Sequence, residues 1–440
     1  MKTYIEGETD VENNYLNDVI SSYSFDYKYA GWNEINEDLL QDENTPPEIL
    51  DKLYEDNKTN PRILRGLSAH PRASKALLKA LSNDVNDAVR WGVADNSATD
   101  PDILEVLSID NVPIIRYRVA KNKHTPVRIL EKLASDENTM IREGVASNEN
   151  APTEVLMKLS GDPDDSVRLA VAENKATMAD ILEKLASDPK DDVRTVIAAS
   201  PNVAGSTLMT LAKDRDIEVR EKVARNNNTP MAAFEELAED PETTVREGVG
   251  WNKVTPNEYL ERLARDRKQS IRTCVAKNPC ASADILELLS ADGDAYVRKA
   301  VAKNETTSEA LLTRLSKDED WRVCESVAGN PNAPENVLEF LATNSDTYLR
   351  KAVASNKGAP TRVLLSLSDD RDWMVRENVA RNPNAPVEAL LKLVDDPDWR
   401  VAKLAVKNPN MSSENLKNLA NHTNYRIRYK VRVELLRNKV

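Results

Sequence analysis

The chain has 440 residues, with 60 lysines and arginines against 73 aspartates and glutamates, which gives a formal net charge of −13. This acidic balance argues against a nucleic-acid footprint spread along the chain. Three cysteines are too few for a disulfide framework, and the sequence shows neither a secretory signal nor a stretch of 18 apolar residues, so we expect a cytoplasmic protein that does not enter a membrane.

Residues 1–31 lie outside any repeat and are acidic and rich in tyrosine. Residues 1–56 hold 15 acidic and 3 basic side chains, a net charge of −12, whereas residues 421–440 hold 6 basic and 1 acidic, a net charge of +5. We interpret residues 1–31 either as a cap over the open face of the first repeat or as an arm that binds a partner. The sequence leaves both interpretations open.

From residue 32 onward one unit recurs with a period of 26 residues. A clear copy begins at Val219 with Val-Arg-x-x-Val-Ala-x-Asn, continues with Thr-Pro and an apolar stretch, and closes on an aspartate. The asparagine stands at positions 96, 122, 148, 174, 226, 252, 278, 304, 330, 356, 382 and 408, and a serine at 200. A fixed period of this size indicates a solenoid, in which each unit packs on its neighbours. We assign residues 32–420 to the array and residues 421–440 to a degenerate, basic capping repeat.

Each unit predicts two short helices. Val219 and Val223 share one face of the first helix. We expect its N-cap to be the aspartate that recurs every 26 residues from 84 to 396, with Asn344 as the exception, which is Asp214 in this copy. The asparagine ends this helix, either in a left-handed conformation or with a side chain that bonds its own turn. The Thr-Pro pair opens the second helix with proline in its first position, and Thr255 and Glu258 have capping-box spacing. The second helix has room for two to three turns, so some copies fit a 3₁₀ helix.

The copy at residues 370–386, DRDWMVRENVARNPNAP, resembles the variant leucine-rich repeat. The resemblance extends over roughly residues 32–434 and implies an all-α solenoid, a right-handed superhelix of about sixteen units that alternate α and 3₁₀ helices. One member of that family holds an iron–sulfur centre on an N-terminal cysteine cluster, but the first cysteine here is Cys274, so no cofactor is implied. A weaker likeness to HEAT-type repeats rests on Asp214 and Arg220 and their spacing. Both families are mainly binding scaffolds.

An arginine recurs with the same period inside the first helix of most units. Such a column could bind phosphates, but an aspartate column of the same period lies near it, so we favour structural Arg–Asp pairing within and between repeats. Where the arginine is lost, at Cys324 and Ala402, Arg322 and Arg400 occur two residues earlier. This coincidence predicts that a local pairing is kept.

No pattern for catalysis or metal binding is present. His70, His124 and His422 belong to unrelated repeats, Cys274 falls in a column where helices approach closely, and Cys280 lies in a turn. The sequence also lacks a nucleophile motif and a glycine-rich phosphate loop. We therefore expect no enzyme, no metal and no cofactor.

Six successive C-terminal units carry an aromatic residue at the start of the first helix, which the repeat itself does not require. These residues are Tyr296, Trp321, Tyr348, Trp373, Trp399 and Tyr425. Tyrosine and tryptophan dominate interface energetics, so the six residues are candidates for a stripe that binds a protein or a second copy of the chain. In the alternative interpretation each ring only staples the preceding loop.

Basic residues adjoin the last of these aromatics and are candidate contacts for an acidic partner, including the acidic N-terminal region of another copy. They are Arg426, Arg428, Lys430 and Arg432. The sequence favours a non-enzymatic scaffold for protein–protein interaction. Two alternatives stay open, namely a filament or particle subunit that assembles head to tail, and a HEAT-like solenoid that binds nucleic acid, which the net charge disfavours.

Overall fold

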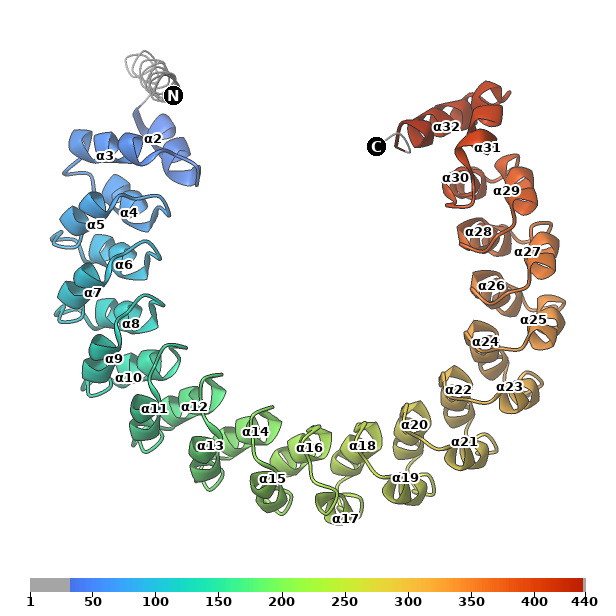
Figure 1. The fold of residues 1–440 in the computed structure, drawn as a ribbon, viewed down its shortest axis with the longest axis horizontal. Helices are drawn as coiled ribbons and strands as arrows, with labels where there is room; N and C mark the ends of the chain where they lie inside the picture. The colour runs from blue at the N-terminus through green and yellow to red at the C-terminus, as the bar shows by residue number, and fades with distance from the viewer. Residues whose placement is uncertain (1–31, 438–440) are drawn as a thin grey trace, which may run out of the picture. The chain divides into compact units, whose positions relative to one another are not determined.

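A computed structural model describes residues 32–437, and within that range the chain forms helices and no strands. The N-terminal region 1–31, expected to be a cap or an arm, lies outside the described residues. The chain divides into two compact units, one up to Ala204 and one from Gly205 onward. In each unit the helices alternate between two layers, with first helices in one layer and second helices in the other (Figure 1).

The helices of the first unit follow one another with short turns. Its first-helix layer contains α2 (Trp32–Gln41), α4 (Pro61–Ala69), α6 (Asp87–Asp95), α8 (Pro113–Lys121), α10 (Thr139–Ala146), α12 (Asp165–Glu173) and α14 (Asp191–Ala199). Its second-helix layer contains α3 (Pro47–Asp56), α5 (Lys75–Leu81), α7 (Pro101–Leu107), α9 (Val127–Leu133), α11 (Thr153–Leu159) and α13 (Ala179–Leu185).

The second unit repeats this plan. Its first-helix layer contains α16 (Ile217–Arg225), α18 (Thr243–Trp251), α20 (Gln269–Lys277), α22 (Ala295–Lys303), α24 (Trp321–Gly329), α26 (Thr347–Ser355), α28 (Trp373–Arg381), α30 (Trp399–Lys407) and α32 (Tyr425–Arg437). Its second-helix layer contains α15 (Gly205–Leu211), α17 (Ala233–Leu237), α19 (Asn257–Leu263), α21 (Ala283–Leu289), α23 (Glu309–Leu315), α25 (Glu335–Ala342), α27 (Thr361–Leu367), α29 (Val387–Val394) and α31 (Ser413–Asn418), followed by the 3₁₀ turn η1 (Leu419–Asn421).

The core of each repeat lies between its two helices and the next repeat. In the copy that begins at α16, Val219, Val223, Phe234 and Leu237 are fully buried. Helices as short as α16 and α17, with nine and five residues, are not stable alone, and burial of each such side chain contributes about 1.5–3 kcal/mol. Stability therefore comes from packing between neighbours. Fifteen helix pairs and a final helix in residues 32–437 confirm the predicted all-α solenoid of about sixteen two-helix units.

The aspartate column does not cap the first helix, contrary to the prediction. Asp164 is the N-cap of α12, and its side chain accepts the Ser166 amide at 3.0 Å. Asp162, the column residue, lies two positions earlier and accepts the Asp164 amide at 3.0 Å. Its carboxylate also binds Arg142 of the preceding repeat. This carboxylate thus joins two repeats, and the N-cap position falls two residues after it.

The second helices also differ from the expectation. The Thr255 hydroxyl donates to the Val249 carbonyl at 2.7 Å and so satisfies the end of α18, instead of forming a capping box with Glu258. Pro256 is the N-cap of α19, not its first helical residue. These helices are α-helical, and the single 3₁₀ turn among residues 32–437 is η1.

The asparagine column clamps consecutive repeats together. The Nδ2 atom of Asn278 donates to the Gly250 and Asn252 carbonyls of the preceding repeat, both at 2.9 Å. Its Oδ1 atom accepts the Cys280 amide at 2.8 Å, as predicted for a side chain that bonds its own turn. No residue among those described has positive φ, so the left-handed alternative is wrong. The same clamp is formed by Asn96, Asn122, Asn148, Asn174, Asn252, Asn304, Asn330, Asn356, Asn382 and Asn408.

Candidate binding surface

The arginines of the column form structural ion pairs with aspartates, as predicted. Arg298 donates from Nε and Nη2 to the two carboxylate oxygens of Asp318 in the next repeat, at 2.7 and 2.8 Å. Its Nη1 atom donates to the Asp292 carbonyl at 2.9 Å. Equivalent pairs are Arg90–Asp110, Arg116–Asp136, Arg142–Asp162, Arg168–Asp188, Arg220–Asp240, Arg246–Asp266, Arg272–Asp292, Arg350–Asp370 and Arg376–Asp396. The arginines of these pairs therefore form no phosphate-binding row.

These pairs predict acid sensitivity. Burial alone would raise the pKa of the Asp318 carboxyl, but hydrogen bonds from Arg298 and from the Asp320 amide outweigh it and lower the pKa. A carboxyl whose pKa is lower in the folded than in the unfolded protein stabilises the fold at any pH above its unfolded-state pKa. This stabilisation is lost as the pH falls through the folded-state pKa, so the melting temperature should drop steeply from about pH 4.5 to pH 2. Calorimetry would test this, and 0.5 M salt should change the drop little because the pairs are buried. A melting temperature that stays level down to pH 2 would contradict the prediction.

The two repeats that lack the column arginine, at Cys324 and Ala402, each keep a local pair, as predicted. Arg322 binds the Asp320 carboxylate at 3.0 and 2.6 Å. In the arginine position, the Cys324 thiol donates to the Asp318 carbonyl at 3.3 Å, the same carbonyl position that a column arginine would contact. The residue twenty positions later, which would accept the fork of an arginine at 324, is Asn344 and not aspartate. The two members of one pair are thus absent together.

The six candidate aromatic residues lie at the N-terminal ends of consecutive first helices, from α22 to α32. They form one edge of the second unit, and we call them the aromatic stripe. The exposed fraction is 54% for Tyr296, 45% for Trp321, 54% for Tyr348 and 66% for Tyr425. The other two, Trp373 and Trp399, are half-buried.

Stacking contacts link the stripe from one repeat to the next. The Trp321 and Tyr348 rings lie 5.6 Å apart between centroids, tilted by 35°. The guanidinium of Arg322 lies 4.8 Å from the centre of the Tyr296 ring. In α30, Arg400 lies 3.6 Å from the Trp373 ring. These contacts order the side chains and leave their outer faces accessible to solvent.

The four basic candidates near the C-terminus do not form one patch. Arg426 is exposed, and its Nε donates to the Tyr425 hydroxyl at 3.2 Å. Arg428 donates to two carbonyls of its own turn. Lys430 is buried and pairs with Glu434, whereas Arg432 is exposed. Only part of this set faces solvent.

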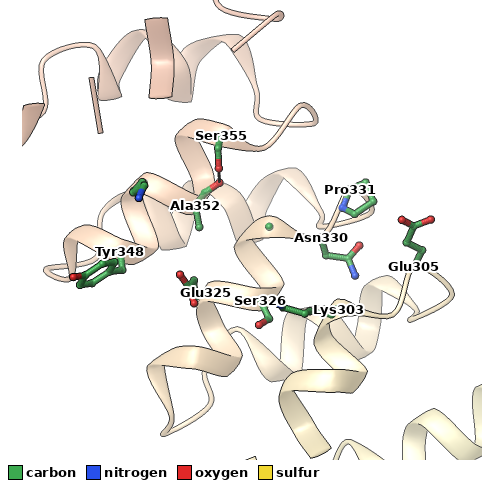
Figure 2. Close-up of a pocket in the computed structure, with 11 residues that line it drawn as sticks. Lys303, Glu305, Glu325, Ser326, Asn330, Pro331, Tyr348, Ala352 and Ser355 are labelled. Atoms are coloured by element: carbon green, nitrogen blue, oxygen red, sulfur yellow. Dashed lines mark hydrogen bonds between the residues drawn. The ribbon is translucent and has the colours of Figure 1, made fainter. Parts of the chain in front are cut away.

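A groove that the sequence reasoning missed adjoins the stripe between α24 and α26 (Figure 2). Its volume is about 460 Å³, and Tyr348 belongs to both features. It is lined by Lys303, Glu305, Glu325, Ser326, Gly329, Asn330, Pro331, Tyr348, Lys351, Ala352 and Ser355. Gly329 and Ser355 end their helices, whereas other first helices of this unit end with long side chains: Arg225, Trp251, Lys277, Lys303, Arg381 and, in α30, Lys407. That departure was a signal available in the sequence.

The buried cysteines predict selective thiol labelling. Burial raises the pKa of the Cys274 thiol to about 11, so the thiol stays protonated and unreactive near neutral pH. Burial also raises the pKa of Cys324, whereas Cys280 is exposed. A maleimide at pH 7.5 should label Cys280 within minutes and the other two only after unfolding, as mass spectrometry would show. Equal labelling of all three in the native protein would contradict this.

Residues 32–437 contain no cluster of three or more histidine, cysteine or carboxylate side chains placed to hold a metal ion. His70 is buried and bonds backbone groups, accepting the Arg72 amide at 3.1 Å. None of the helices in this range has the length and apolar character that crossing a bilayer requires.

Residues 373–398 match the family model for the leucine rich repeat variant, which confirms the resemblance for that repeat. Comparison with curated proteins finds no match. A solved structure described as a leucine-rich repeat variant with a novel repetitive motif is 29% identical, over 46% of this chain and 80% of that one, with a TM-score of 0.36.

Two further solved structures also align with this chain as folds. A Kap121p mutant is 13% identical over 91% of this chain and 56% of its own length, with a TM-score of 0.39. Kap95p, solved with RanGDP, is 12% identical over 92% of this chain and 66% of its own length, with a TM-score of 0.35. The chain therefore spans about half to two thirds of the length of these two proteins.

Proposed function

Because residues 373–398 form a leucine-rich repeat variant unit and the other repeats share its pattern, we propose that the protein is a cytoplasmic, non-enzymatic scaffold that binds another protein through the aromatic stripe. The observation that carries this proposal is a row of tyrosine and tryptophan rings on consecutive repeats, four of them exposed and two, Trp321 and Tyr348, in contact with each other. Exposed aromatic residues that gather at one edge are typical of interfaces, and an aromatic hot-spot residue contributes about 2 kcal/mol or more to binding.

The charges beside the stripe support a protein partner more than a nucleic acid. Hydrogen bonds from Arg322 lower the pKa of the Asp320 carboxyl to about 2, so this carboxylate stays ionised and neutralises the guanidinium beside it. Arg400 binds Asp398 in the same way. Both guanidinium groups therefore present flat stacking surfaces with little free charge, which suits protein side chains better than phosphates.

Affinity capture from the native lysate tests the proposal. The tagged parent should recover a protein partner, and the triple variant Trp321→Ala, Trp373→Ala, Trp399→Ala should recover at least tenfold less, because one hot-spot residue alone is worth about 2 kcal/mol. Trp251→Ala is the matched control, since Trp251 is 41% exposed on the same layer but outside the stripe. Circular dichroism and thermal melting check that every variant folds.

Equal capture by the parent and the triple variant would refute binding through the stripe. If the tagged protein recovers only further copies of itself, the assembly alternative replaces the scaffold for other proteins. Salt-sensitive recovery of DNA or RNA would favour the nucleic-acid alternative instead.

A further inference from the structure

Glu325 in the groove lacks the arginine partner that the same position has in two other first helices of the second unit. In α16, Glu221 pairs with Arg225 four residues later, at 2.9 Å. In α28, Glu377 pairs with Arg381 at 2.8 Å. In α24 the residue four positions after Glu325 is Gly329, and Glu325 forms no ion pair among residues 32–437. A half-buried carboxylate thus lines the groove without an ion pair to the described residues.

Gly329 has no local structural reason to be glycine. Its φ is not positive, and a Cβ atom built there would meet nothing within 4 Å. Gly329 is the last residue of α24, and glycine in a helical conformation is less favourable than alanine, so the chain loses some stability at this position. The open space beside Gly329 lies against Glu325, where an arginine stands in α16 and α28.

The rest of the groove suits one planar cation. Figure 2 shows Tyr348 and Glu325 on the same side of the groove, so an aromatic ring and a carboxylate are both available to an inserted guanidinium. Ser326 and Ala352 are small and leave room for the aliphatic part of the side chain. Lys303, which is exposed, and Lys351, which is half-buried, also line the groove and form no ion pairs with residues 32–437. Two lysines beside the groove would repel a second basic residue.

We propose that the groove between α24 and α26 receives one arginine side chain from the partner protein. The guanidinium pairs with Glu325 and lies against the Tyr348 ring, in the position that Arg225 and Arg381 occupy within their own helices. The residues around this arginine are neutral or acidic, because two lysines line the groove. The inference rests on the proposed function, since Tyr348 belongs to both the stripe and the groove.

The test uses a phage-displayed library of random 12-residue peptides, selected on the immobilised full-length protein. Selected peptides should share a single arginine among neutral or acidic residues. Gly329→Arg should reduce their binding tenfold or more, because the new arginine fills the groove and pairs with Glu325. The variant should melt at the parent temperature or above, since it replaces a helical glycine. Glu325→Gln should weaken the same peptides with the groove still open.

Ser147→Arg is the matched control, because it places an arginine four residues after Glu143 at the same repeat position in the first unit. It should leave the peptides bound. Selected peptides without the shared arginine, equal binding to the parent and to Gly329→Arg, or no selected peptide at all would overturn the inference. If that happens while lysate capture still depends on the three tryptophans, the groove assignment fails and the scaffold proposal stands. If capture also survives their loss, both fail.

Discussion

Asn278→Asp should destabilise the second unit by about 3–5 kcal/mol near neutral pH. Asn278 is fully buried, and its Nδ2 group donates to the Gly250 and Asn252 carbonyls. Aspartate has the same shape but no donor, so a carboxylate would face two carbonyl oxygens and leave them without partners. Protonation would restore one donor, and the deficit should therefore shrink toward pH 4.

Hydrogen exchange and urea unfolding would measure this effect. Because each repeat packs on its neighbours, amide protection should fall first in α18 and α20 and less in distant helices. Asn227→Asp is the control, since Asn227 is exposed in a turn and its substitution adds the same charge. If both variants lose equal stability, charge and not the clamp is responsible, and the assigned role of the column is wrong.

Much of this fold could be predicted because the signals are local and repeated. The period, the two helices of each unit and the pairing of arginine with aspartate all follow from residues that recur at fixed spacing. The N-cap prediction failed because the first helix begins two residues later than the column aspartate would require, even where the residue there, such as Val112 before α8, has no side chain that can cap. The Asp162 carboxylate accepts the Asp164 amide before α12 and binds Arg142 of the preceding repeat. That second role depends on a contact across repeats.

The aromatic residues of the candidate surface could be found in the sequence, whereas the groove beside them could not. Six aromatic residues in one column are visible in the sequence, and the structure places them along one edge of the second unit. The groove arises from the lack of a side chain at Gly329, which has meaning only beside the Glu–Arg pairs of α16 and α28. The reach of Asn278 to carbonyls 26 and 28 residues earlier also required the packed neighbours.

The second large effect concerns the Arg–Asp pairs. Arg350 is 6% exposed and forks onto Asp370 at 2.6 and 3.0 Å. Arg350→Cys should destabilise the second unit by about 3–5 kcal/mol, because removing one member of a buried pair leaves the other charge without compensation. Unfolding in urea, followed by circular dichroism, would measure the loss.

Adding Asp370→Asn to Arg350→Cys should recover most of that stability, because it removes the stranded carboxylate. The chain already contains this arrangement at Cys324 and Asn344. There the thiol donates to the Asp318 carbonyl, and the Asn344 side chain still accepts the amide two residues later at 2.9 Å. Equal instability of the single and double variants would show that the fork itself, and not the uncompensated charge, determines the loss. A recovery would mean that the two members of a pair can be lost together at little cost in stability, but not singly. That coupling explains why positions 324 and 344 depart from the pattern together.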